Sequence, residues 1–345
     1  MKDFETRAVI DWLTVGVTFK RQTQFRFVQG EIDEFFERTP HVKDYEESSH
    51  HTSDRFKITI QEPDIASVVK ALAAIDAKFG LRFAPSILGI EFSVDFTPHE
   101  PSDLLRAQMH RVLSSHLLTD RDLLTNELAR PRTVWGTKLK VLQLVDSTGT
   151  AKQSPFVDGT TFFGEKGADV HWRVMDKIID RQNRAAGTYD ALEEQEKRAR
   201  VEVTLRYDEL KRVGLRHFND LAIFNIAELQ GRYFRFYLPT FKTDPRQEPH
   251  LGTGREAWRD RQRWNAFKIA GNIAVNAMDQ ATTRHRQHLR KGERTTMQRM
   301  KLMLKKTRRI ALGKEGTFVA YDDLNRRVLG ALRNLRIRVV AGFDP

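Results

Sequence analysis

The sequence contains no cysteine and no long hydrophobic run. The lack of cysteine excludes disulfides, thiolate metal sites and cysteine nucleophiles. No apolar stretch approaches the roughly 20 residues that span a bilayer, and the polar opening Met1-Lys2-Asp3-Phe4-Glu5 is unlike a signal peptide. There is no glycine-rich phosphate loop of the Walker type, so no ATPase is implied. We therefore expect a cytoplasmic protein without a membrane partner.

What the chain does have is an excess of positive charge. Its 345 residues include 58 Lys and Arg against 46 Asp and Glu, a net charge of +12, which is typical of nucleic-acid binders. The excess gathers between residues 284 and 309, where only Glu293 opposes it. Like charges at that density repel each other unless a polyanion neutralises them, which favours DNA binding over a solvated helix face. The predicted DNA contacts are Arg284, Arg286, Arg290, Lys291, Arg294, Lys305, Lys306, Arg308 and Arg309.

Hydrophobic periodicity predicts an α+β fold, an antiparallel or mixed sheet with helices on one face in a split βαβ-like layout. A linker rich in Pro, Asp, Gly and Thr divides the chain into domains 1–240 and 255–345, the second helical and basic. The expected strands are residues 8–19, 55–60, 90–96, 138–145, 160–164, 171–177, 200–206 and 232–238. The expected helices are residues 64–79, 101–118, most of 176–198, further helices after residue 206 up to about residue 230, then 256–278, 283–312 and the end of 316–338.

Two of these strands carry acidic residues opposite an apolar face. In residues 90–96, Glu91 and Asp95 alternate with apolar positions, and Glu202 does so in residues 200–206. Because side chains of a strand alternate between faces, we expect Glu91, Asp95 and Glu202 on the open face of one sheet. Carboxylates are the ligands that hard divalent cations prefer. Asp11 ranks below these three, because strict alternation groups it with Leu13 and Val15.

Five segments in order resemble the rolling-circle replication initiators of filamentous phages and small plasmids, the replication initiation factor (Rep_trans) type. They cover roughly residues 8 to 240. The segments are Ile10-Asp11-Trp12-Leu13-Thr14, Glu91-Phe92-Ser93-Val94-Asp95-Phe96, Thr161-Phe162-Phe163-Gly164-Glu165-Lys166, Arg173-Val174-Met175-Asp176-Lys177 and Arg200-Val201-Glu202-Val203.

The resemblance implies a nickase and ligase that cuts one strand of origin DNA through a tyrosyl-DNA intermediate. It implies Mg²⁺ or Mn²⁺ held by Glu91, Asp95 and Glu202, and Arg173 and Lys177 beside the scissile phosphate. Double- and single-stranded origin DNA, and a host helicase and polymerase, are the implied partners. The oligomeric state stays open, a homodimer included.

The nucleophile departs from the family pattern. That pattern reads Arg-x-Tyr-x-Lys, whereas this chain has Met175 in the place of the tyrosine. We expect Tyr189, in a polar helix-start context, to take the role, with Tyr207 at the end of the Glu202 strand as second choice. Two alternatives remain: a DNA-binding protein that kept the fold without catalysis, and a metal nuclease that uses water.

Overall fold

The computed structural model describes residues 1–45, 52–119, 123, 130–134, 159–183, 188–248, 250, 254–299 and 318–343. For residues 181–183, 188–189 and 281–299 it describes the backbone alone. Within this part of the chain, no helix is long and apolar enough to cross a membrane. The predicted strand 138–145, and Lys305, Lys306, Arg308 and Arg309, lie outside it.

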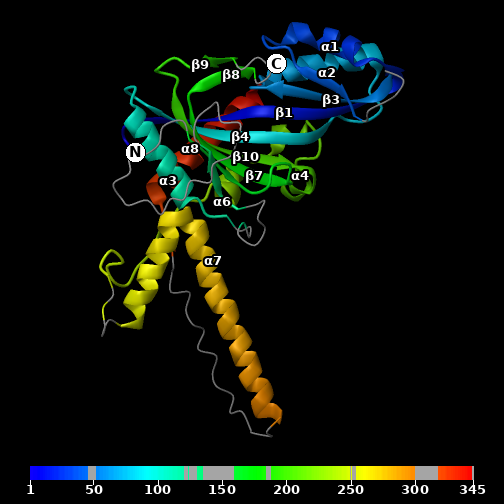
Figure 1. Cartoon of the computed structure of the whole chain (residues 1–345). Helices are drawn as coiled ribbons and strands as arrows, with labels where there is room; N and C mark the ends of the chain where they lie inside the picture. Colours follow the sequence, from blue (N-terminus) through cyan, green and yellow to red (C-terminus); the bar gives the residue numbers. More distant parts are fainter. Residues whose placement is uncertain are drawn as a thin grey trace.

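An antiparallel sheet of eight strands, in the order β2-β3-β1-β4-β10-β7-β6-β5, organises the molecule (Figure 1). This confirms the predicted α+β class. The strands of the sheet are β1 (Phe4–Thr23), β2 (His41–Asp44), β3 (Ser53–Gln61), β4 (Ser86–Pro98), β5 (Arg132–Val134), β6 (Thr160–Phe163), β7 (Val170–Lys177) and β10 (Arg198–Arg206).

Helices cover the apolar face of this sheet. Leu13, Ile90 and Leu205 face each other across β1, β4 and β10 and are fully buried, because alternate residues of paired strands share a face. The helices are α1 (Phe25–Ile32), η1 (Asp33–Phe35), α2 (Ile65–Phe79), α3 (Asp103–His116), α4 (Tyr207–Val213), α5 (Asp220–Ile223), α6 (Glu228–Tyr233), α7 (Arg255–Arg299) and α8 (Asp322–Ala341).

The C-terminal helix α8 belongs to the same core. Its Leu324, Val328, Leu332 and Val339 are buried with the sheet residues, and Arg327 and Arg338 donate hydrogen bonds to the carbonyls of Phe4 and Ala8 in β1. Helix α7 instead extends away from the sheet in two arms (Figure 1). The arms meet at Gly271 (φ 61°), where a Cβ would lie 2.3 Å from the Ser115 carbonyl oxygen.

Two segments differ from the sequence prediction. Residues 176–198 were expected to be mostly helical, but β8 (Ile179–Asn183) and β9 (Thr188–Ala191) form an antiparallel pair instead. Tyr189 therefore lies in a strand. In residues 232–238, α6 continues to Tyr233 and only β11 (Tyr237–Pro239) is extended, paired with β12 (Phe318–Ala320). In both places tertiary pairing overrides local propensity.

Candidate metal centre

The face of the sheet opposite the helices carries a layer of polar side chains. In the register of β4 with β10, Asp95 lies opposite Arg200, Ser93 opposite Glu202, and Glu91 opposite Thr204. Alternation along the strands predicts an open face, yet each of these six residues is at most 5% exposed. Their charges are therefore balanced within the protein rather than by water.

A β-bulge brings Asp11 to this layer. Ile10 pairs with Phe92 and Trp12 with Glu91, so Asp11 is an extra residue in β1 without a partner in β4. An inserted residue breaks the alternation of faces, and Asp11 leaves the side of Leu13. The backbone N–H of Glu62 donates to the Asp11 carbonyl over 2.7 Å. Glu62 itself has a positive φ of 43°, a strained conformation for a residue other than glycine.

Asp11, Glu91 and Glu202 converge at the centre of this face. One carboxylate oxygen from each lies within 4.8 Å of the other two, and among the described residues this is the group with the spacing of a metal site. We call these three residues the acidic cluster. They come from β1, β4 and β10, three neighbouring strands, so the sheet register fixes their separation.

Three cations surround the acidic cluster. Arg200 donates a hydrogen bond to Asp11, and its Nη1 lies 3.5 Å from a Glu202 oxygen. Arg173 donates to Glu202, and its Nη2 lies 3.4 Å from Glu91. The Lys177 ammonium is 3.8 Å from Asp11. The structure thus places Arg173 and Lys177, both predicted from the sequence, at the edge of the cluster.

Two carboxyl groups of the acidic cluster, those of Glu91 and Asp11, differ in their affinity for protons. Burial, together with the charge of Glu202, raises the pKa of Glu91 to about 8. Burial also opposes ionisation of Asp11, but Arg200, Lys177 and Arg173 outweigh it and lower the pKa of this carboxyl. Near neutral pH, Glu91 therefore holds a proton that a cation can replace.

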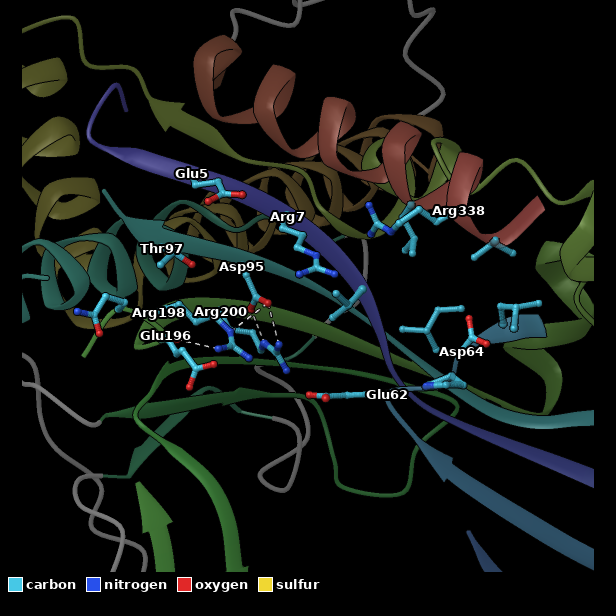
Figure 2. A pocket seen from close by; sticks show the side chains of 17 residues that line it. Glu5, Arg7, Glu62, Asp64, Asp95, Thr97, Glu196, Arg198, Arg200 and Arg338 are labelled. Carbon is cyan, nitrogen blue, oxygen red and sulfur yellow. Dashed lines mark hydrogen bonds and ion pairs between the residues drawn. The ribbon is translucent and has the colours of Figure 1, made fainter. Parts of the chain in front are cut away.

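Asp95 lies on the same face but outside the acidic cluster. Its two oxygens accept hydrogen bonds from Nε and Nη2 of Arg200, the latter at 2.8 Å. Nε of Arg198 is 3.1 Å away. Figure 2 shows Asp95 and these two arginines at the wall of a cavity of about 620 Å³, which Arg7 and Arg338 also line. With both oxygens engaged, Asp95 orients Arg200.

The predicted nucleophiles lie in two different settings. Tyr207 follows β10 directly, is 62% exposed and has a φ of 44°. Tyr189 pairs with Gln182 in the β8–β9 hairpin, but its side chain is outside the described part. Met175 lies on the polar face of β7, opposite Arg200 and Thr160.

The predicted DNA-contacting residues between 284 and 299 lie on α7. Only the backbone of this part of α7 is described.

Comparisons with known proteins give a likeness among solved structures. No family model and no curated protein matches the chain. Among solved structures, it is similar to the rolling circle replication initiator protein from Geobacillus stearothermophilus, at 12% identity and a TM-score of 0.34, over 78% of this chain and 98% of that chain. A likeness this low identifies neither the fold nor the activity.

The raised pKa of Glu91 predicts a pH-dependent loss of stability in EDTA. The native state binds the Glu91 proton more tightly than the unfolded state, whose pKa is near 4.5. The contribution of protonated Glu91 to the free energy of unfolding is therefore complete below pH 4.5 and is lost as pH rises through about 8. The loss is at most about 1.4 kcal/mol per pH unit. Chemical denaturation between pH 5 and 9 should show this loss in the wild type and a smaller one in Glu91→Gln.

Glu228→Gln is the control, because Glu228 is exposed on α6 and contacts Arg232 and Asn225 at the protein surface. Its curve should run parallel to that of the wild type. If the Glu91→Gln curve is parallel as well, Glu91 does not hold the proton.

Proposed function

We propose that this protein is a divalent-metal-dependent enzyme that cuts and rejoins one strand of origin DNA, as rolling-circle initiators do. The observation that carries the proposal is the convergence of Asp11, Glu91 and Glu202 beside Arg173 and Lys177. Buried carboxylates bind a hard cation, and the flanking cations suit a phosphodiester. A net charge of +12 supports a polyanionic substrate.

The donor set fits Mg²⁺ or Mn²⁺. Arg173, Arg200 and Lys177 surround the three carboxylates, yet burial and the charge of Glu202 keep a proton on Glu91. Asp11, Glu91 and Glu202 would hold the ion in place of that proton. When bound, the ion polarises the scissile phosphate and stabilises the leaving oxygen. This assignment gives Asp11 the ligand role that the family resemblance implied for Asp95.

The surrounding basic residues divide into two roles. The Arg173 side chain is 34% exposed, so its free N–H groups can bind the non-bridging oxygens of a phosphate. Lys177 is 13% exposed and balances charge beside Asp11 and Glu62. Arg200 is only 1% exposed. It therefore acts as a positioning residue, holding Asp11 and Glu202 in place rather than touching DNA.

A tyrosine completes the proposed reaction. Its phenolic oxygen loses its proton and attacks phosphorus, the bond from phosphorus to the 3′ oxygen breaks, and that oxygen leaves as a 3′-OH. The 5′ phosphate stays on the tyrosine until a 3′-OH reverses the step, and the freed 3′-OH would serve a polymerase. Tyr189 remains our first candidate. Tyr207 is the second, and its exposure and strained backbone support it, since strain gathers at functional sites.

One observation favours a second function. The position that holds tyrosine in the family carries Met175, whose thioether cannot act as this nucleophile. A site with the same carboxylates and an activated water would hydrolyse the strand without a covalent intermediate. If the protein neither forms the covalent intermediate nor hydrolyses the strand, its function would be DNA binding without catalysis.

Covalent capture of DNA separates these functions. With Mn²⁺ and a pool of labelled single strands, the wild type should form a protein–DNA adduct, and Tyr189→Phe should form none. Glu202→Gln should also form none, because the acidic cluster loses a ligand. Tyr45→Phe is the control, since Tyr45 packs beneath Arg55 and Lys57.

An adduct that persists in Tyr189→Phe and disappears in Tyr207→Phe moves the role to Tyr207. Cleavage without any adduct supports the water route. A wild type that neither cleaves nor forms an adduct contradicts the proposed enzyme.

The basic segment 284–309 should supply affinity rather than chemistry. Each phosphate contact releases counterions and contributes about 0.9 to the slope of log affinity against log salt. Replacing Arg290, Lys291, Lys305 and Lys306 with Gln should therefore flatten that slope in fluorescence anisotropy titrations. A control with the exposed residues Lys20, Lys43, Lys70 and Arg216 changed to Gln keeps the same net charge. If both variants flatten the slope equally, the segment has no special role.

A further inference from the structure

A second group of side chains continues the polar face beyond the acidic cluster. In the sheet register, Trp12 and Thr204 both lie opposite Glu91, and His171 lies opposite Thr204. Arg206 is two residues further along β10, opposite Gly89. Two residues of a strand span about 7 Å, which is close to the spacing of neighbouring phosphates in a single strand.

Trp12 reaches this face because of the bulge at Asp11. Its indole lies against Gly89, where a Cβ would be 2.8 Å from both Cη2 and Cζ3. A side chain at position 89 would therefore displace the indole. The guanidinium carbon of Arg206 lies 5.4 Å from the centroid of the Trp12 ring. Glycine at 89 thus makes room for the aromatic ring, over which the guanidinium of Arg206 lies.

This part of the face is basic. Among the described residues, no carboxylate forms an ion pair with Arg206. Nδ1 of His171 is buried without a hydrogen-bond partner. Burial, and then the charges of Arg206, Arg173, Lys166 and Arg132, lower the pKa of His171 to about 4. Several cations lie around a neutral imidazole here, and a bound anion would stabilise this concentration of positive charge.

We propose that Trp12 and Arg206 form a subsite for the nucleotide next to the scissile phosphate, in which Trp12 stacks on the base and Arg206 binds the phosphate. Indole stacking accepts any base, and guanidinium N–H groups bind phosphate oxygens. The subsite would orient a single strand across the acidic cluster. This inference rests on the proposed function for the identity of its ligand.

Binding of single strands with one missing base tests the subsite. The full chain is titrated in EDTA, where no metal-dependent cutting occurs, with a labelled oligonucleotide selected for binding. An abasic nucleotide is moved along it one position at a time. In the wild type, one position should weaken binding about tenfold, which is the size of a single stacking contact.

Trp12→Leu should remove this dependence, so that intact and abasic strands bind equally. Trp12→Phe should retain the dependence on the base. This result would show that the effect of Trp12→Leu comes from loss of the aromatic ring and not from a disturbed fold. Gly89→Ala should reduce it, because the added Cβ displaces the indole. Arg206→Gln should keep the dependence on the base and lower the salt slope by about 0.7, the value of one phosphate contact to a single strand. Trp258→Leu and Arg216→Gln, two changes at exposed residues, should match the wild type.

An abasic profile that is the same in Trp12→Leu and the wild type overturns the subsite, as does a wild type without a sensitive position. The proposed cutting activity is scored separately with Mn²⁺. A chain that shows the Trp12-dependent profile and never cuts DNA keeps the subsite and loses the nickase. A chain that cuts DNA without this profile keeps the nickase and loses the subsite.

Discussion

The guanidinium of Arg200 is the interaction on which the rest of the site depends. It is 1% exposed and binds Asp95 through two N–H groups, and it also binds Asp11 and approaches Glu202. A buried carboxylate without a partner costs several kcal/mol. Arg200 therefore allows β1, β4 and β10 to present carboxylates to one another inside the protein. The planar guanidinium also fixes their directions, which a lysine would not do.

The sheet sustains this charged layer because its other face is mainly apolar, with the buried ion pair of Asp176 and Arg106 as an exception. Ile10, Phe92, Val203 and Trp172 lie side by side across four strands and are all buried. Their burial stabilises a register in which a shift of one residue would exchange the two faces. The bulge at Asp11 is the local exception. It is held by the strained Glu62, and it adds both Asp11 and Trp12 to the polar face.

Alternation in the sequence predicted much of this arrangement, and its failures have physical causes. Glu91, Asp95 and Glu202 do share a face, because β4 and β10 pair without a bulge. Alternation failed for Asp11, since no local signal marks the extra residue in β1. Alternation also could not show that both oxygens of Asp95 accept hydrogen bonds from Arg200. The β8–β9 pair was missed because its charged residues resemble a helix when pairing is ignored.

The central claim is that Asp11, Glu91 and Glu202 hold the metal while Asp95 only orients Arg200. A titration of the full chain with Mn²⁺ tests it directly. Binding is monitored in this titration by the decrease of the electron paramagnetic resonance signal of free Mn²⁺. Asp11→Asn should weaken Mn²⁺ binding at least about tenfold more than Asp95→Asn, because a lost ligand costs more than a lost supporting contact. Binding that is weakened by Asp95→Asn and unaffected by Asp11→Asn would contradict the account.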